Sequence, residues 1–149
     1  MGDPAILVID PGVDKCGIAA LSHSSVLGHA VVPTVDLVPI VGAWLERHHI
    51  ELVLVGDRTG GANVRRVVMR SFPMVSVVAV EEGGTTLDAR RLYFADHPPR
   101  GWRRFVPRSM QLPAVPYDDY AAIVMGRRYL QGGVSGKLYG TSPKEEESP

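Results

Sequence analysis

Acidic side chains recur in this sequence where a hydrophobic run meets a turn or where a helix is expected to begin. The positions are Asp10, Asp57, the pair Glu81 and Glu82, and the pair Asp118 and Asp119. In an α/β sheet the carboxyl ends of parallel strands line one edge, and ligands bind outside that edge. Carboxylates that converge there repel each other unless a cation lies between them, and oxygen ligands without His or Cys suit Mg²⁺ or Mn²⁺. The pattern indicates a divalent-metal site, whereas each residue taken alone also fits an ordinary turn or helix cap.

Five short hydrophobic runs have the length and composition of buried strands. They cover residues 5–10, 17–21, 26–32, 51–56 and 75–80. Short turns separate the first three runs, which favours an antiparallel meander. The last two alternate with helical segments, which favours parallel pairing. The sequence therefore predicts an α/β fold with a five-stranded mixed sheet flanked by helices.

Four segments place hydrophobic residues at helical spacing. They cover residues 36–49, 62–72, 85–97 and 117–130. Pro39 is compatible with the first of these helices only in its first turn. Between the third and fourth helices, residues 98–116 hold five of the chain's twelve prolines, with Trp102 and Phe105 among four arginines. A connection of this length is typical of a functional or disordered loop, and its aromatic rings are suited equally to stacking on unpaired bases or to pinning the loop to the body.

The composition is that of one globular domain. The chain has 149 residues, no net charge and a single cysteine, Cys16, which we interpret as a small core residue. We expect one domain over residues 1–133 and a flexible tail over residues 134–149. No run is long and apolar enough to span a membrane, and no cationic signal-peptide start is present, so we expect a cytoplasmic protein without a membrane partner. Without residues 141–149 the chain keeps 15 basic and 13 acidic side chains, so the neutral total excludes only a strongly basic nucleic-acid binder.

Three blocks of sequence, taken in order, resemble those of one known family. Residues 10–19, Asp-Pro-Gly-Val-Asp-Lys-Cys-Gly-Ile-Ala, resemble the opening of ribonuclease H-like resolvases. Residues 81–89, Glu-Glu-Gly-Gly-Thr-Thr-Leu-Asp-Ala, are similar to the Asp-Glu-Arg-Leu-Thr-Thr-x-x-Ala segment of the YqgF (RuvX) family. Residues 118–122, Asp-Asp-Tyr-Ala-Ala, resemble that family's Asp-Ala-x-Ala-Ala helix. Residues 53–56 match its Val-Val-Gly strand, and the resemblance spans about residues 5–131.

The resemblance implies a ribonuclease H-like fold and a nuclease that hydrolyses phosphodiester bonds with Mg²⁺ or Mn²⁺. Carried over position by position, the catalytic and metal-binding triad is Asp10, Glu82 and Asp118. Such a triad suits two-metal catalysis, in which paired ions activate water and stabilise the leaving oxygen. The cations expected to hold the remaining phosphates of the nucleic acid are Lys15, Arg58, Arg103 and Arg104.

The sequence departs from the family beside the expected catalytic Glu82. Glu81 stands where the family has Asp, and Gly83 and Gly84 replace its Arg-Leu pair, so an arginine is missing there. We expect Arg58, at the neighbouring strand end, to supply the lost positive charge. The same departures also fit a retained fold with weakened or lost activity.

Three classes of function are consistent with these observations. The first is a metal-dependent nuclease, monomeric or homodimeric, acting on structured RNA such as ribosomal precursor ends, which we favour, or on branched DNA such as Holliday junctions. The second is a catalytically weak or inactive module that binds nucleic acid or a protein partner. The third, a sugar kinase or actin-like ATPase, needs two such domains to enclose a nucleotide, and this chain has room for one.

Overall fold

A mixed six-stranded sheet forms the centre of the computed structural model, which describes residues 4–58, 60–81, 85–97, 118–132 and 136–140. The strands are β1 (Ile6–Asp10), β2 (Lys15–Leu21), β3 (Val26–Pro33), β4 (Leu52–Gly56), β5 (Ser76–Val80) and β6 (Gly136–Gly140). Their order across the sheet is β3-β2-β1-β4-β5-β6. The first three strands pair antiparallel, whereas β1, β4 and β5 are parallel. The predicted five-stranded mixed sheet is thus confirmed.

The strand β6 adds to the prediction, which assigned its residues to the C-terminal tail. It pairs antiparallel with β5, with Val78 opposite Leu138 and Val80 opposite Gly136. Backbone hydrogen bonding along a sheet edge does not require a hydrophobic run. The segment Gly-Lys-Leu-Tyr-Gly carries little strand signal of its own, which is why no strand was predicted there.

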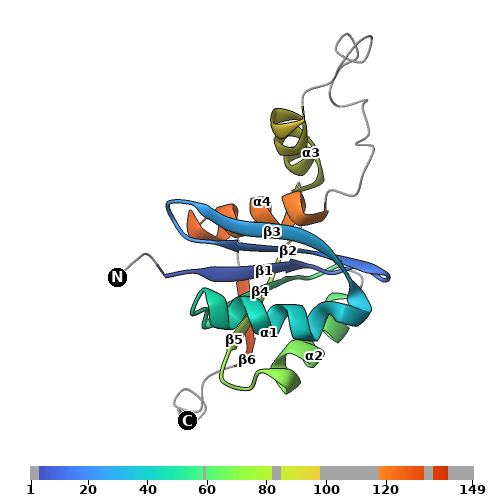
Figure 1. Ribbon diagram of the computed structural model, residues 1–149, viewed down its shortest axis with the longest axis vertical. Coiled ribbons are helices and arrows are strands. Elements are labelled where there is room, and N and C mark those ends of the chain that lie inside the picture. The colour runs from blue at the N-terminus through green and yellow to red at the C-terminus, as the bar shows by residue number, and fades with distance from the viewer. Residues whose placement is uncertain (1–3, 59, 82–84, 98–117, 133–135, 141–149) are drawn as a thin grey trace.

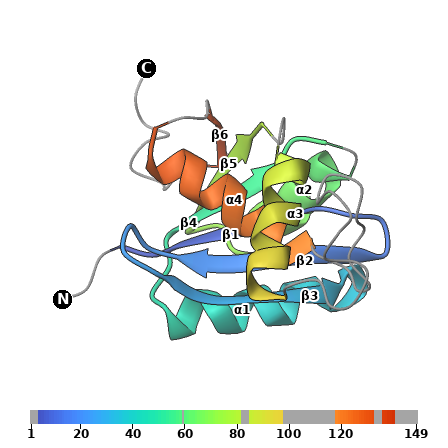
Figure 2. The ribbon, with the colours of Figure 1, turned by 90° about the horizontal axis from the view of Figure 1, so that it is seen from above.

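In the residues that the structure describes, four α-helices cover the two faces of the sheet. They are α1 (Leu37–Arg47), which follows the short 3₁₀ helix η1 (Thr34–Asp36), α2 (Gly61–Ser71), α3 (Thr85–Asp96) and α4 (Asp118–Leu130). The views in Figures 1 and 2 show α3 and α4 on one face and α1 and α2 on the other. Pro39 lies in the first turn of α1, as predicted. Within the described part of the chain, no helix is both long and apolar enough to cross a membrane.

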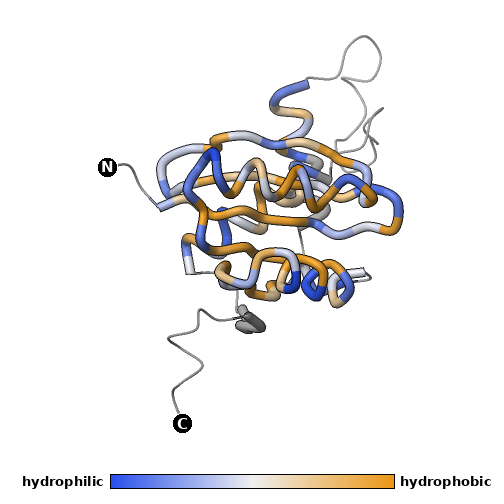
Figure 3. Tube along the Cα trace, turned by 60° about the horizontal axis from the view of Figure 1, so that its bottom comes forward, coloured by the Kyte–Doolittle hydropathy of each residue, from blue (hydrophilic) through white to orange (hydrophobic). Residues whose placement is uncertain are grey.

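Side chains along β1 point alternately to the two faces of the sheet, and the hydrophobic core is divided into two clusters accordingly. Ile6 and Val8 pack with residues of α3 and α4, whereas Leu7 and Ile9 pack with residues of α1 and α2. Burial on both faces explains why this strand has an unbroken hydrophobic sequence. Hydropathy colouring shows the hydrophobic segments concentrated in the strands (Figure 3). Because side chains alternate along a strand, Asp10 lies on the same face as Val8, which is the face covered by α4.

The helix α4 packs closely on β1 and β2 at Gly126, which is buried. A Cβ atom at Gly126 would lie 2.2 Å from Cδ1 of Leu21 and 2.8 Å from Cγ2 of Val8. Real Cβ atoms do not approach other atoms so closely, so α4 or these two side chains would have to shift. The glycine therefore sets how near α4 lies to the sheet.

We expect Gly126→Ala to lower the free energy of unfolding by about 1–3 kcal/mol, the usual effect of overpacking a core. A net loss is informative, because alanine normally stabilises a helix interior by about 1 kcal/mol relative to glycine. Urea denaturation measures the change. Gly28→Ala is the control, since its Cβ would meet the Trp44 ring at an ordinary 3.6 Å. Equal free energies of unfolding for the two variants and wild type would refute the close approach.

Candidate functional site

The carboxyl ends of β1, β4 and β5 lie side by side at one edge of the sheet. Asp10 is the last residue of β1, Asp57 follows β4, and Glu81 follows β5. The backbone N–H of Asp57 donates a hydrogen bond of 3.0 Å to the carbonyl oxygen of Val80, which ties the ends of β4 and β5 together. Asp10 is half-buried, whereas Asp57 and Glu81 are exposed. The fold thus brings three of the predicted acidic positions to one edge.

The turn that follows Asp10 is held in place by Thr34, the first residue of η1, which directly follows β3. The Thr34 hydroxyl donates to the carbonyl oxygen of Gly12 at 3.1 Å, and its backbone N–H donates to the carbonyl oxygen of Asp14 at 2.8 Å. Next in the chain comes Lys15, the exposed first residue of β2. These hydrogen bonds therefore fix the position of the backbone at Lys15, next to the edge of the sheet that carries Asp10.

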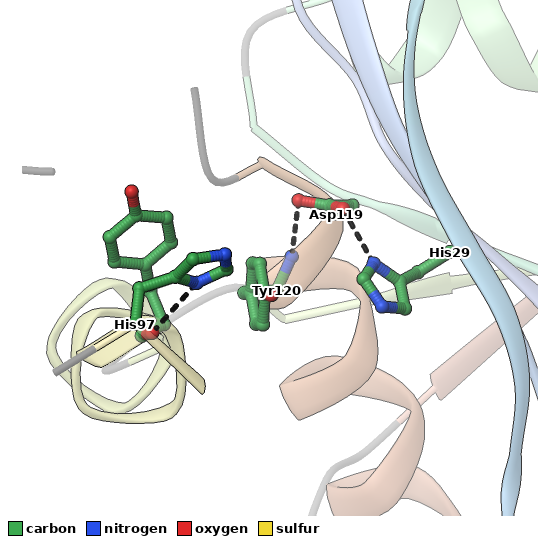
Figure 4. A network of polar contacts seen from close by, with 5 residues as sticks. His29, His97, Asp119 and Tyr120 are labelled. Carbon is green, nitrogen blue, oxygen red and sulfur yellow. Dashed lines mark hydrogen bonds and ion pairs between the residues drawn. The ribbon is translucent and has the colours of Figure 1, made fainter. Parts of the chain in front are cut away.

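The start of α4 is fixed to β3 by a buried carboxylate. Asp119 is only 8% exposed, and its Oδ2 accepts a hydrogen bond of 2.7 Å from Nδ1 of His29 on β3. Its Oδ1 accepts a 3.1 Å hydrogen bond from the backbone N–H of Tyr120. Figure 4 shows Asp119 between these two partners. Both carboxylate oxygens of Asp119 are thus engaged within the protein.

The register of the sheet relates this contact to Asp10. On the face covered by α4, Val8 lies opposite Ala19, and Ala19 lies opposite His29. Two residues further along β1, Asp10 occupies the next position on that face. The beginning of α4 therefore lies over β3, which is two strands, or about 10 Å, away from β1 across the sheet. Along the strands it lies one same-face position before Asp10. The residue that precedes Asp119, Asp118, is the first residue of α4.

The other predicted site residues are placed only in part. Arg58 is exposed and directly follows Asp57 at the same edge. The residues Glu82, Arg103 and Arg104, and the side chain of Asp118, lie outside the described part of the chain. Among the residues that are described, no three His, Cys, Asp or Glu side chains gather as a metal site. The donors that the edge does present are carboxylate oxygens, the ligand type that fits Mg²⁺.

Several aromatic and ionisable residues beside Asp119 were missed by the sequence analysis. The Tyr120 ring lies 5.2 Å from the His29 ring and 5.6 Å from the Tyr93 ring, which stacks on His97 at 4.6 Å. Burial, followed by a hydrogen bond with Asp96 and the charges nearby, raises the pKa of Tyr120 to about 12. These residues come from β3, from α3 and the residue that follows it, and from α4, so no local motif could have indicated them.

The raised pKa of Tyr120 leads to a prediction about stability at alkaline pH. An unfolded tyrosine loses its proton near pH 10, whereas folded Tyr120 keeps its proton to about pH 12. The folded state therefore binds more protons in this window, and its stability falls as the pH rises. We expect the free energy of unfolding to fall more steeply between pH 10 and 12 in the wild type than in Tyr120→Phe. Urea denaturation at several pH values measures both slopes, and equal slopes would contradict the raised pKa.

Comparison with solved structures places this architecture among known folds. A structure of T. thermophilus RuvC in complex with a Holliday junction substrate aligns with 90% of this chain and 99% of its own, at 16% identity and a TM-score of 0.52. A second structure of Thermus thermophilus RuvC aligns with 89% of this chain and 99% of its own, at 14% identity and a TM-score of 0.51. The chain has a ribonuclease H-like fold, as the resemblance in the sequence implied.

Comparison of the sequence with known families and proteins does not assign the chain to a family. No protein-family model matches the chain, and no curated protein matches it significantly. The similarity to the YqgF family therefore stays a prediction. At these identities the likeness to RuvC shows the fold alone.

Proposed function

We propose that this protein is a divalent-metal-dependent nuclease that hydrolyses phosphodiester bonds in structured nucleic acid. The observation that carries the proposal is that Asp10, at the end of the central strand β1, lies on the face of a ribonuclease H-like sheet that α4 covers, while the start of α4 lies over β3, two strands away. The half-buried position of Asp10 supports a role beyond that of a surface turn residue. Asp57 and Glu81 add negative charge at the same edge, which favours a bound cation.

The residues proposed to hold Mg²⁺ or Mn²⁺ are Asp10, Glu82 and Asp118. Bound there, the ions would lower the pKa of a water nucleophile and stabilise the leaving oxygen. Of the two acidic residues that open α4, Asp119 already uses both oxygens internally, which favours Asp118 as the ligand. The protein's own contribution is to hold Asp10 and Asp118 on rigid elements, namely a buried strand and a helix fixed to β3.

The residues proposed to bind the phosphates beside the scissile bond are Lys15, Arg58, Arg103 and Arg104. Lys15 and Arg58 are exposed and lie next to the edge that carries Asp10. Cations placed there offset the negative charge of the carboxylates for an incoming polyanion, and arginine adds bidentate hydrogen bonds to phosphate. Structured RNA and branched DNA offer the same phosphate chemistry, so both are proposed substrates.

A cleavage assay tests the proposal. The purified chain is incubated with a labelled four-way DNA junction and with a structured ribosomal RNA precursor, in Mg²⁺, in Mn²⁺ and in EDTA. We expect cleavage of at least one substrate with either metal and none in EDTA. The alternative, a catalytically weak module, is favoured by Gly83 and Gly84 in place of the family's Arg-Leu pair. Binding of the substrates without metal-dependent cleavage would support that alternative and overturn the nuclease.

A further inference from the structure

The outer side of α2 carries a concentrated positive charge. Val64 and Val68 bury the inner side of this helix in the hydrophobic core. The opposite side forms a shallow hollow that we call the α2 arginine surface, lined by Ala62, Arg65, Arg66, Met69 and Arg70. The helix contains three arginines and no acidic residue, so its own charge is unbalanced. Arg66 and Arg70 are exposed, four residues apart, and like charges at that spacing destabilise a helix.

The helix α2 begins at the edge of the sheet that carries the candidate site. A Cβ atom at Gly61 would lie 2.3 Å from the carbonyl oxygen of Gly56, so the first turn of α2 packs directly on the end of β4. The preceding Gly60 approaches the turn that follows Asp10, since a Cβ there would lie 4.0 Å from the carbonyl oxygen of Gly12. From this start the axis rises about 1.5 Å per residue, which places Arg70 about 14 Å from the edge.

The chemistry of the α2 arginine surface selects an extended polyanion. Guanidinium groups bind phosphates with paired hydrogen bonds and stay charged at any physiological pH. Arginines spaced along a helix contact successive groups of a chain better than they enclose one small anion, and the hollow between them is open. Bound phosphates would also relieve the repulsion between Arg66 and Arg70.

We propose that the α2 arginine surface binds the phosphodiester backbone of a nucleic-acid arm that extends past the candidate active site. The inference rests on the proposed function, because it takes the substrate to be nucleic acid that reaches the edge carrying Asp10. The proposed contacts between α2 and the phosphates lie on the face of the sheet opposite the face that α4 covers. A substrate with two or more arms can reach both faces around that edge, which fits structured RNA or branched DNA.

The test compares Arg66→Ala/Arg70→Ala with wild type for binding of a fluorescent four-way junction in metal-free buffer. The matched control is Arg47→Ala/Arg127→Ala, which removes the same charge from exposed positions on α1 and α4. We expect the α2 variant to bind about tenfold more weakly at low salt, and the slope of log affinity against log salt to fall by about two, one for each phosphate contact. The control variant should change both quantities far less.

Two results would overturn this inference. One is an equal loss of affinity in the control variant, which would indicate a general effect of net charge. The other is unchanged junction binding by the α2 variant, and lost binding of that variant to polyglutamate would then assign the surface to an acidic protein partner. Thermal melting verifies that each variant is folded. If the wild type binds and cleaves nucleic acid and the α2 variant does so equally well, only this inference is refuted. If the wild type binds no nucleic acid, the proposed function itself is refuted.

Discussion

Asp10→Asn is expected to lower the rate of metal-dependent cleavage by on the order of 10³-fold while leaving the fold intact. The amide keeps the size of the carboxylate but removes the negative charge that would bind the cation. Asp10 is half-buried at the end of β1, where its neighbours fix its position. Its replacement therefore changes charge with little change in packing. Single-turnover cleavage with saturating enzyme measures the rate, and thermal melting verifies the fold.

Asp57→Asn is the matched control for Asp10→Asn. It removes the same charge from the same edge, but Asp57 is exposed and lies outside the proposed triad. We expect its rate of cleavage to stay within a few-fold of wild type. If both variants lost activity equally, the carboxylates would act only through their summed charge. An Asp10→Asn variant as active as wild type would remove Asp10 from the reaction.

Asp119→Ala is expected to lower the free energy of unfolding by about 1–3 kcal/mol. The variant loses a buried carboxylate that accepts hydrogen bonds from Nδ1 of His29 and from the backbone of Tyr120. These contacts fix the start of α4 to β3, so we also expect weaker metal binding through the adjacent Asp118. Urea denaturation measures the stability, and calorimetric titration with Mn²⁺ measures the metal affinity.

His29→Ala provides the control for this prediction. If the pair acts as a unit, the double variant Asp119→Ala/His29→Ala should lose less stability than the sum of the two single variants, with a coupling of about 0.5–3 kcal/mol. Strict additivity would show that the 2.7 Å contact contributes no pairwise energy. Unchanged Mn²⁺ affinity in Asp119→Ala would show that the contact does not position the metal site.

Much of the sheet could be predicted because β1, β2, β4 and β5 are buried along nearly their whole length. A strand such as β1 must be hydrophobic at every position, and Asp10 marks where that burial ends. The helix predicted at residues 117–130 is observed as α4, Asp118–Leu130, because its hydrophobic periodicity follows from packing on β1 and β2. The topology then brings the ends of β1, β4 and β5 to one edge, as the pattern of acidic residues suggested.

Contacts between distant elements could not be predicted. His29 and Asp119 are 90 residues apart, and a single histidine in a strand carries no signal of its partner. The sequence also gave no physical basis for distinguishing Asp118 from Asp119, since both open the same helix. In the structure Asp119 is turned toward β3 and already has two hydrogen-bond donors, which favours Asp118 as the proposed ligand.

The measurement that tests the central claim most directly is a calorimetric titration of the protein with Mn²⁺. Wild type should bind Mn²⁺, and Asp57→Asn should bind it with similar affinity. Binding should be lost or strongly weakened in Asp10→Asn and in Asp118→Asn, because the site is proposed to need the carboxylates of both β1 and α4. Absence of Mn²⁺ binding in wild type, or equal binding in all four proteins, would contradict a metal centre at this edge of the sheet.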